Sequence, residues 1–182
     1  MAADKPQEDW ASAADSELLS YVKRSHHGAL TEILRRYESP LIGFLTSQTG
    51  ERTTAEDIAQ DTFLKLIKRP PFMLNSGSLK PWLFRVATNL ANDYRRKHSR
   101  VQAVETIPDE PNADFQQLGN QQDSEYFMSQ LSPEIRIVVS LRLYGDLSYK
   151  EIAQQLKIPV GTATWRMKNG LETLKSKFKS AE

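Results

Sequence analysis

The chain has 182 residues, of which 39% are hydrophobic, and a formal net charge of +1. This size suits one domain or two small ones with compact cores. The absence of cysteine excludes disulfides and thiolate metal sites, and the three histidines lack ligand-like spacing with carboxylates, so we expect no metal ion and no cofactor. No apolar run reaches the roughly 18 residues of a membrane span, and the acidic start does not fit a signal peptide. We therefore expect a cytoplasmic protein without membrane insertion.

The charges are segregated along the chain. Residues 63–100 hold 9 basic residues and 1 acid, a net charge of +8, and residues 131–182 hold 9 and 5, a net charge of +4. Residues 1–62 hold 6 and 11, a net charge of −5, and residues 101–130 hold 0 and 6, a net charge of −6. Because attraction between charges is screened beyond about 10 Å, two separated basic blocks indicate two separate contacts with a polyanion.

The first third of the chain predicts short helices and no β-strands. Residues 1–14 are polar and Ala-rich, which is typical of a loosely held tail. Helices are expected over residues 15–23 and 29–37, each with its apolar side chains on one face. Pro40 interrupts the second pattern, so we expect it to begin a separate helix that runs to Leu45.

The next segment predicts a helix with a polar outer face. Thr53 and Glu56 have the spacing of a capping box, which opens a helix to about residue 68. Its apolar face, Ile67 included, is expected to be buried. A leucine among acids on the opposite face is typical of a protein-binding hot spot, although acids near a helix start also simply complement the helix dipole. The candidate protein-binding residues are Asp57, Gln60, Asp61 and Leu64.

Residues 78–100 form the most informative stretch. Ser78 can cap a helix whose apolar stripe runs from Trp82 to Tyr94. Arginines attract phosphates, and amide side chains hydrogen-bond to base edges, so the other face is a candidate nucleic-acid interface; the alternative is the solvated face of a core helix. That polar face consists of Arg85, Thr88, Asn89, Asn92, Arg95 and Arg96.

Residues 101–122 combine proline, glycine and glutamine with several acids and no basic residue. This composition predicts a flexible linker. Fully extended, it would reach roughly 70 Å, about twice the 34–36 Å of one DNA turn. The flanking domains could therefore bind separate parts of a duplex.

The C-terminal segment predicts a helix-turn-helix. Ser148 and Glu151 form a second capping box, and after a tight turn a basic helix runs from Gly161 to about residue 178 with Leu171 packed inward. In such a unit the first turns of the second helix enter the major groove. The outward candidates are Thr162, Thr164, Trp165, Arg166, Lys168 and Asn169.

Taken together, these segments resemble bacterial RNA polymerase sigma factors of the extracytoplasmic-function group (group IV of the sigma-70 family) over residues 15–178. The matching motifs are AEDIAQDTFLKLIK at residues 55–68, PWLFRVATNLANDYRRK at residues 81–97, and LSYKEIAQQLKIPVGTATWRMKNGLETLK at residues 147–175. Three motifs in the family's order, with an acidic linker between the second and third, are far more specific than any one of them.

The resemblance implies an all-α protein that is not an enzyme and that has two small helical domains joined by a flexible acidic linker. The implied organisation is a tail (1–14), a region 2 domain for core polymerase and the minus-ten element (15–100), the linker (101–122), and a region 4 helix-turn-helix domain for the minus-thirty-five element (123–182). The implied partners are core RNA polymerase, promoter DNA and an anti-sigma factor, and the implied function is initiation at a specific, stress-related set of promoters.

The resemblance also assigns roles to individual residues. It implies core polymerase contacts by Asp57, Gln60, Asp61 and Leu64, and capture of a flipped base by residues 75–78. Minus-ten contacts fall on Arg85, Asn89, Asn92, Arg95 and Arg96, and minus-thirty-five contacts fall on Thr162, Thr164, Trp165, Arg166, Lys168 and Asn169.

The last helix departs from the family pattern at two places. Thr164 and Trp165 stand where the family commonly has Lys-Ser before Arg166. Gly170 stands where basic residues are usual, and it weakens a helix by about 1 kcal/mol relative to alanine. These departures bear on the upstream sequence preference of the chain rather than on its role.

Two other functions fit the same residues. A helix-turn-helix regulator with a sensing N-terminal domain would bind DNA without polymerase and would have no use for the residues from Asp57 to Leu64. A helical adaptor or anti-sigma-like protein would use its basic blocks only for solubility. Complexes of such an adaptor would lack the steep salt dependence that phosphate contacts impose.

Overall fold

The computed structural model describes residues 10–74, 77–102 and 122–179, and within these ranges every regular element is an α-helix. The predicted all-α class is therefore confirmed. None of the described helices is both long enough and apolar enough to cross a membrane. The helices are α1 (Asp15–Val22), α2 (His27–Thr49), α3 (Arg52–Lys68), α4 (Lys80–Gln102), α5 (Gln122–Ser129), α6 (Pro133–Leu143), α7 (Tyr149–Leu156) and α8 (Val160–Lys179).

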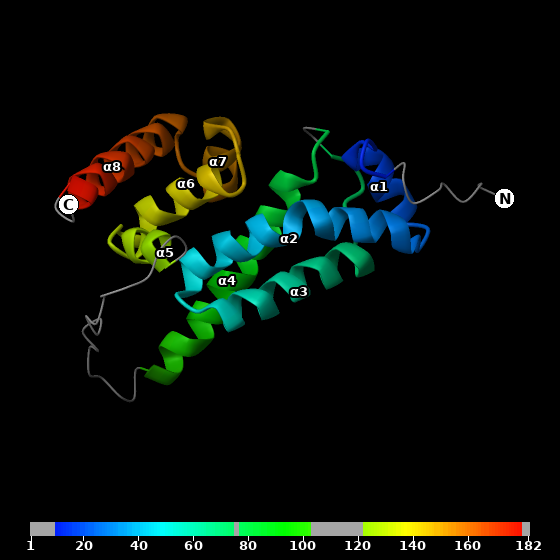
Figure 1. The fold of residues 1–182 in the computed structure, drawn as a ribbon, viewed down its shortest axis with the longest axis horizontal. Coiled ribbons are helices and arrows are strands. Elements are labelled where there is room, and N and C mark those ends of the chain that lie inside the picture. Colours follow the sequence, from blue (N-terminus) through cyan, green and yellow to red (C-terminus); the bar gives the residue numbers. More distant parts are fainter. Residues whose placement is uncertain (1–9, 75–76, 103–121, 180–182) are drawn as a thin grey trace.

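Helices α1–α4, which we call the N-terminal half, pack around α2. Figure 1 shows α2 and α3 running side by side with α4 crossing behind them, while α1 packs against one end of α2. The apolar stripes of these helices meet in a core where Leu41, Phe44, Leu66 and Leu83 are fully buried. Burial of large apolar side chains at about 1.5–3 kcal/mol each holds the helices together.

Helix α2 continues through Pro40, so the predicted break at this residue is wrong. A proline inside a helix costs about 3 kcal/mol because it removes one backbone hydrogen bond and crowds the preceding turn. The apolar stripe nevertheless continues across it, with Tyr37, Leu41 and Phe44 all buried. Their combined burial outweighs the cost, and α2 ends instead at Gly50, whose φ of 76° is left-handed.

The start of α3 also differs from the prediction. The helix begins at Arg52, and its N-cap residue is Glu51, which accepts a 2.6 Å hydrogen bond from the Thr54 hydroxyl. Thr53 therefore lies inside the helix, and Glu56 pairs with Arg52 at 2.8 Å instead of completing a capping box. The predicted pair of Thr53 and Glu56 is therefore replaced by two other pairs, Thr54 with Glu51 and Arg52 with Glu56.

Helices α5–α8, which we call the C-terminal half, contain the helix-turn-helix as α7 and α8. The capping box of Ser148 and Glu151 is present as predicted, and Lys157, with a φ of 56°, ends α7 and makes the turn. The contact face of α8 falls on Ala163, Met167 and Gly170 at helical spacing, and Leu171 lies beside that face, 43% exposed rather than packed inward.

At Gly170 the backbone of α8 lies close to α6. A β-carbon at this position would lie 2.5 Å from Cγ2 of Val139 and 2.9 Å from Cγ2 of Ile135. These distances are too short for any side chain. Gly170 weakens α8 as an isolated helix, but it allows α8 to pack closely against α6.

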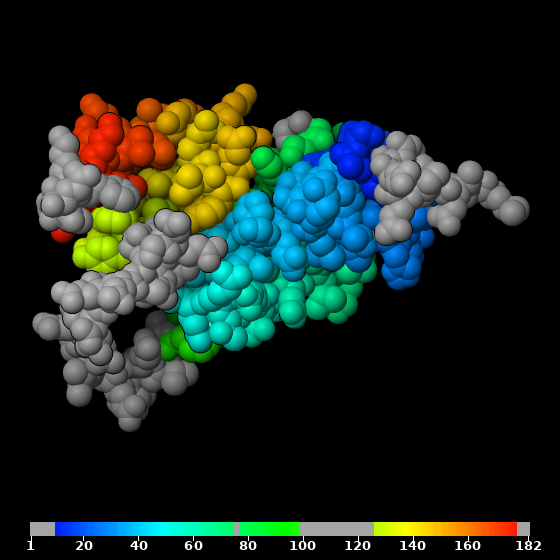
Figure 2. Space-filling model, in the orientation of Figure 1, coloured from blue at the N-terminus to red at the C-terminus, as the bar shows by residue number. Residues whose placement is uncertain are grey.

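The two halves lie directly against each other (Figures 1 and 2). One continuous apolar core joins Phe44 and Phe84 of the N-terminal half to Leu141 and Leu147 of the C-terminal half. The ring of Tyr144 fills the space beside Gly43, where a β-carbon would lie 2.7 Å from its Cε1. We call this relation of the two halves the closed arrangement.

Buried polar groups also pair across this contact. The hydroxyls of Ser47 and Ser140 are 2.8 Å apart, and the Gln48 amide donates to Ser140 Oγ at 3.3 Å. Near the rim, Lys80 and Asp146 form an exposed ion pair at 3.9 Å, which contributes little. Most of the predicted linker, residues 103–121, lies outside the described residues.

Candidate protein and nucleic-acid interfaces

The four candidate protein-binding residues lie together on the outer face of α3. Asp57, Gln60, Asp61 and Leu64 are all exposed, as the sequence predicts, and Leu64 leaves 46% of its surface open. Ile67, predicted to be buried, is instead 45% exposed. Ile67 follows the buried Leu66 and points away from the core, so it extends the apolar part of the outer face.

A groove of about 730 Å³ runs beside this face, between α2 and α3. Its floor is apolar and its rim is charged, which is the usual composition of a protein-binding surface around a hot spot. Gln60 and Leu64 belong to both the groove and the outer face of α3. The groove is lined by Leu34, Glu38, Ser39, Ile42, Arg52, Glu56, Ala59, Gln60, Phe63, Leu64 and Ile67.

The candidate minus-ten residues share one exposed face of α4. Arg85, Asn89, Asn92, Arg95 and Arg96 are all exposed. Arg95 donates a hydrogen bond to the Asn92 side chain, and Arg96 pairs with Asp93 at 3.2 Å, so these cations are held along the helix by neighbours on α4. Such contacts between exposed groups are weak and would readily yield to phosphates.

Thr88 does not belong to that exposed face. It is 5% exposed, because Gln155 of α7 covers it and donates to its hydroxyl at 2.9 Å. The pattern of α4 alone cannot distinguish a threonine that faces solvent from one that faces a second domain.

One cation from the C-terminal half, Arg136, lies near the same helix. Burial, and in addition the charge of Arg95, lower the pKa of Arg136 at the start of α6. The Arg136 guanidinium donates to the carbonyls of Ser129 and Leu131, at 3.3 and 3.0 Å. In the closed arrangement α6 thus adds a cation beside the basic end of α4.

The segment that precedes α4 is the predicted base-capturing loop. Asn75 and Ser76 lie outside the described residues, whereas Gly77 has a left-handed φ of 71° and Ser78 is half-buried. Just before it, Phe72 is 90% exposed. A cavity of about 300 Å³ lies between α1 and this segment and is lined by Ser16, Leu19, Ser20, Lys23, Phe72, Met73, Leu74 and Gly77.

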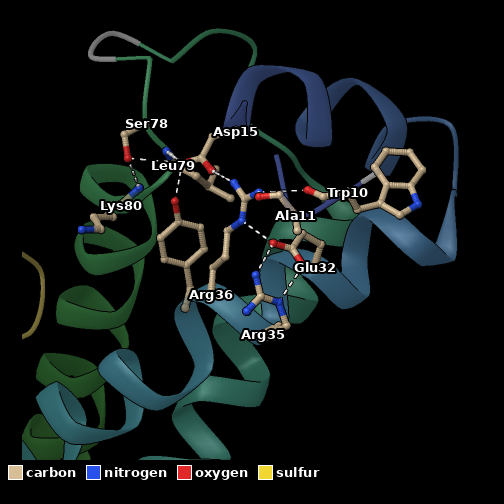
Figure 3. Close-up of polar contacts among 10 residues, drawn as sticks. Trp10, Ala11, Asp15, Glu32, Arg35, Arg36, Ser78, Leu79 and Lys80 are labelled. Carbon is tan, nitrogen blue, oxygen red and sulfur yellow. Dashed lines mark hydrogen bonds and ion pairs between the residues drawn. The ribbon is translucent and has the colours of Figure 1, made fainter. Parts of the chain in front are cut away.

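Asp15 anchors the start of α4. Its carboxylate accepts a 2.7 Å hydrogen bond from the backbone N–H of Leu79 and a 3.2 Å bond from the Ser78 hydroxyl. It also accepts from the Tyr37 hydroxyl and, at 3.2 Å, from Arg36 (Figure 3). The Ser78 hydroxyl in turn accepts from the Lys80 N–H at 3.3 Å, which is the capping role predicted for Ser78. The Asp15 carboxylate is a second acceptor at the same helix end.

Arg36 links this carboxylate to the beginning of the described chain. It donates to the carbonyls of Trp10 and Ala11, both at 3.0 Å, and pairs with Glu32 at 2.6 Å. Trp10 is 3% exposed, so residues 10–14 differ from the predicted loose tail. The Trp10 ring packs against Gly28, which has no side chain in the way. Burying so large an apolar ring stabilises this part of the chain.

The acidity of Glu32 is strongly perturbed in this network. The hydrogen bond from Arg35 and the further bond and charge of Arg36 lower the pKa of Glu32 to about 2, against the opposing effect of burial. Burial, and then the Asp15 carboxylate, raise the pKa of Tyr37. The residues form an ion-pair network inside the N-terminal half, and sequence periodicity did not find it because its members are up to 64 residues apart.

The candidate minus-thirty-five residues lie on the first three turns of α8. Thr164, Trp165 and Lys168 are exposed, whereas Thr162, Arg166 and Asn169 are half-buried. Trp165 exposes 59% of its surface, as its position off the apolar stripe predicts. Lys168 reaches Glu172 only at 4.0 Å. The face therefore offers a large aromatic ring together with cationic and amide groups, which suits contact with a DNA groove.

Metal-binding side chains do not gather anywhere in the described part of the chain. No group of three or more histidine, cysteine, aspartate or glutamate residues is placed to hold an ion there. The chemistry that these surfaces can perform is recognition of a protein and of nucleic acid, by apolar contact, charge and hydrogen bonding.

Two family models match most of the chain. Residues 24–101 match the model described as Sigma-70 region 2, and residues 127–176 match the model described as Sigma-70, region 4. The first match begins after α1, so Asp15 and Trp10 lie outside it.

Individual proteins are similar over nearly the full length. The extracytoplasmic-function sigma factor SigW of Bacillus subtilis is 26% identical over 181 residues, which cover 88% of this chain and 95% of that protein. The sigma-E factor of Haemophilus influenzae is 24% identical, over 90% of this chain and 95% of the relative.

Solved structures show the same fold. The sigma factor RpoE of Bartonella quintana, solved with the anti-sigma factor NepR, gives a TM-score of 0.68 at 24% identity and covers 82% of this chain and 96% of its own. CnrH, solved with the cytosolic domain of CnrY, gives 0.67 at 20% identity, covering 93% of this chain and 100% of its own.

Proposed function

Because this chain belongs to the sigma-70 family, as a sigma factor of the extracytoplasmic-function type, we propose that it directs polymerase to one stress-related set of promoters through the surfaces described above. A sigma factor is a non-catalytic subunit that binds core RNA polymerase and promoter DNA in the cytoplasm and directs transcription initiation. The proposed division is a region 2 domain at residues 15–100 and a region 4 domain at residues 123–182, joined by a linker at residues 101–122.

The polymerase-binding surface is the outer face of α3. Asp57, Gln60, Asp61 and Leu64 supply acids around an exposed apolar centre, and the groove beside them provides further buried area for a partner element. A hydrophobic centre with a charged rim is the arrangement that gives a stable yet selective protein contact.

The minus-ten surface is the exposed face of α4 together with the segment before it. Arg85, Arg95 and Arg96 neutralise phosphates, and Asn89 and Asn92 offer amides to base edges. Gly77 and Ser78, at the N-terminal end of the helix, belong to the segment that captures an unpaired base. The single observation that carries the proposal is the exposure of all five residues on one side of α4.

The minus-thirty-five surface is the start of α8. Arg166 pairs with a phosphate or a guanine edge, Asn169 suits an adenine, and Trp165 packs on the sugar–phosphate wall or a thymine methyl group. Because Thr164 and Trp165 replace the usual residues before Arg166, the upstream element of this chain differs from that of most relatives.

An anti-sigma factor restrains this chain by covering the outer face of α3 and part of the C-terminal half. The similar sigma factor RpoE was solved with the anti-sigma factor NepR, which supports this assignment. The groove between α2 and α3, with a volume of about 730 Å³, has room for an element of such a partner.

A run-off transcription assay tests the proposal. Purified chain, core polymerase and a library of promoter fragments are combined, and the transcripts are sequenced to map their start sites. We expect initiation from fragments that share a minus-ten and an upstream element, with steep inhibition by salt because phosphate contacts release counterions. Absence of any selected start site would overturn the proposal, and sequence-specific binding without polymerase would favour a helix-turn-helix regulator.

A further inference from the structure

We propose that Asp15 is a positioning residue for promoter opening, because its buried carboxylate fixes the N-terminal end of α4 in the geometry that captures an unpaired minus-ten base. The inference rests on the proposed function of α4 and of the segment before it. Asp15 itself touches no DNA, and it lies before residue 24, where the match to region 2 begins.

The carboxylate joins three separate segments of the chain. It comes from α1, accepts from Arg36 and Tyr37 of α2, and accepts from Ser78 and Leu79 at the start of α4. Asp15 is 8% exposed. Four donors on one nearly buried carboxylate leave it little freedom, so the backbone at Leu79 is held in one position relative to α1 and α2.

A carboxylate suits this position for two physical reasons. The first backbone N–H groups of α4 have no partner within the helix, and the helix dipole places partial positive charge there. Arg36, which is itself fixed by Glu32 and by the carbonyls of Trp10 and Ala11, balances the buried negative charge. Asparagine at position 15 would keep the shape but lose the charge and one acceptor.

A residue at the other end of α1 contacts the segment between α3 and α4 as well. Lys23, just after α1, donates to the carbonyl of Phe72 at 3.2 Å and lies 5.8 Å from the centre of its ring. Asp15 in α1 and Lys23 just after it therefore contact the connection between α3 and α4 at two places, Leu79 and Phe72. Arg95 and Arg96, two of the proposed phosphate contacts, lie about 24 Å or more farther along the helix, so Asp15 acts on the base-capturing end of α4 and not on them.

The variant Asp15→Asn, assembled as full-length chain with core polymerase, tests the inference. The probe is a fluorescent single-stranded oligonucleotide with the non-template minus-ten sequence that the transcription library selects. Further copies each carry one abasic site. Binding is measured by anisotropy, and Glu17→Gln on the same helix is the matched charge control. Tyr37→Phe removes one donor to the same carboxylate and provides a milder variant if Asp15→Asn folds poorly.

For the wild-type chain, the abasic site at the captured position should weaken binding about tenfold, the typical effect of one stacked base. With Asp15→Asn the intact oligonucleotide should bind about tenfold more weakly than it binds the wild type. The abasic site should then lower the affinity of the variant by less than about twofold, because capture of the base is already lost. Glu17→Gln should retain the full wild-type discrimination, and Tyr37→Phe should lose part of it.

A merely structural role gives a different result. If Asp15 only supports folding, Asp15→Asn lowers binding of intact and abasic probes by the same factor, and the discrimination remains; this outcome overturns the inference and leaves base capture standing. If no abasic site weakens wild-type binding, base capture itself is wrong and the role of Asp15 falls with it. The two failures are thus distinguished by the wild-type measurements alone.

Discussion

Gln155, in the first helix of the helix-turn-helix, donates a hydrogen bond at 2.9 Å to the buried hydroxyl of Thr88 on α4. The helix-turn-helix proposed to bind the minus-thirty-five element therefore packs against the helix proposed to open the minus-ten element. The two elements are separated by roughly 25 base pairs, which is about 85 Å of B-DNA at 3.4 Å per pair. The two proposed surfaces cannot both engage one straight promoter while this hydrogen bond persists, so we expect the closed arrangement to open on the way to initiation.

Locking the closed arrangement should therefore block transcription. The chain has no cysteine, and the hydroxyls of Ser47 and Ser140 are 2.8 Å apart, so Ser47→Cys with Ser140→Cys places two thiols within reach of a disulfide. We expect the oxidised variant to lose most run-off transcription from promoters that need both elements and to recover it after reduction. Each single-cysteine variant is the control and should be insensitive to oxidation. Full activity of the oxidised protein would mean that the two halves need not separate.

The outer face of α3 and the face of α4 should have separable functions. Asp61→Arg reverses an exposed charge at the proposed polymerase contact and should weaken core polymerase binding about tenfold or more without changing the melting temperature. Asn89→Ala is the matched comparison and should lower promoter opening while polymerase binding is unchanged. Co-sedimentation with core enzyme and permanganate reactivity of the minus-ten element measure the two effects. Equal loss of polymerase binding by both variants would contradict the assignment.

Trp165 should matter for DNA and not for folding. With 59% of its surface exposed it contributes little to the core, so Trp165→Ala should leave thermal unfolding nearly unchanged. Loss of its contact should weaken binding to the upstream element by about five- to tenfold, measured with holoenzyme on duplex fragments with and without that element. A drop of several degrees in melting temperature, with unchanged selectivity for the element, would instead make Trp165 a structural residue.

Gly170 should be more stabilising than alanine, contrary to helix propensity. Alanine there gains about 1 kcal/mol of intrinsic helix stability but forces Val139 and Ile135 apart, which costs about 1–3 kcal/mol, so the net effect should be destabilisation by roughly 1 kcal/mol. Gly161→Ala is the control, because nothing lies within 4 Å of a β-carbon at that position. Urea unfolding measures both variants, and a stabilised Gly170→Ala would show that α6 and α8 are not tightly seated.

Glu32 should make the chain sensitive to acid. Its pKa is lowered from 4.5 to about 2 in the folded chain, so its ion pairs stabilise the fold fully above a pH of about 4.5, and this stability is lost as the pH falls toward about 2. Glu32→Gln should lower the melting temperature by a few degrees at neutral pH and flatten its decline over that range. Glu38→Gln, an exposed carboxylate on the same helix, is the control for thermal unfolding followed by circular dichroism. Parallel pH profiles for wild type and Glu32→Gln would contradict the prediction.

Local signals in the sequence predicted local structure at several places, although the capping box expected at Thr53 and Glu56 is absent. The capping box of Ser148 and Glu151 needs only four residues and is present. The exposed arginines and asparagines of α4 followed from helical periodicity alone, because one side of the helix is apolar and buried. Such features depend on neighbours within one or two turns, and these are visible in the order of the residues.

Long-range partners were not predictable in the same way. Asp15 has the pattern of an acid in the first turn of a helix, and only the fold shows that its carboxylate serves α4. Pro40 failed as a helix breaker because buried residues on both sides outweigh its cost, and Thr88 is buried by a helix from the other half. For Asp15 and Thr88 the deciding neighbour lies far away along the chain, where no periodicity reaches.

Gly43 gives the closed arrangement a sensitive point. The Tyr144 ring occupies the space where any β-carbon at position 43 would stand, so even a methyl group there would act as a wedge between the halves. A single substitution at this glycine would loosen the resting state without altering one residue proposed to contact polymerase or DNA. The stability of the closed arrangement would then be set at a position that no proposed recognition surface contains.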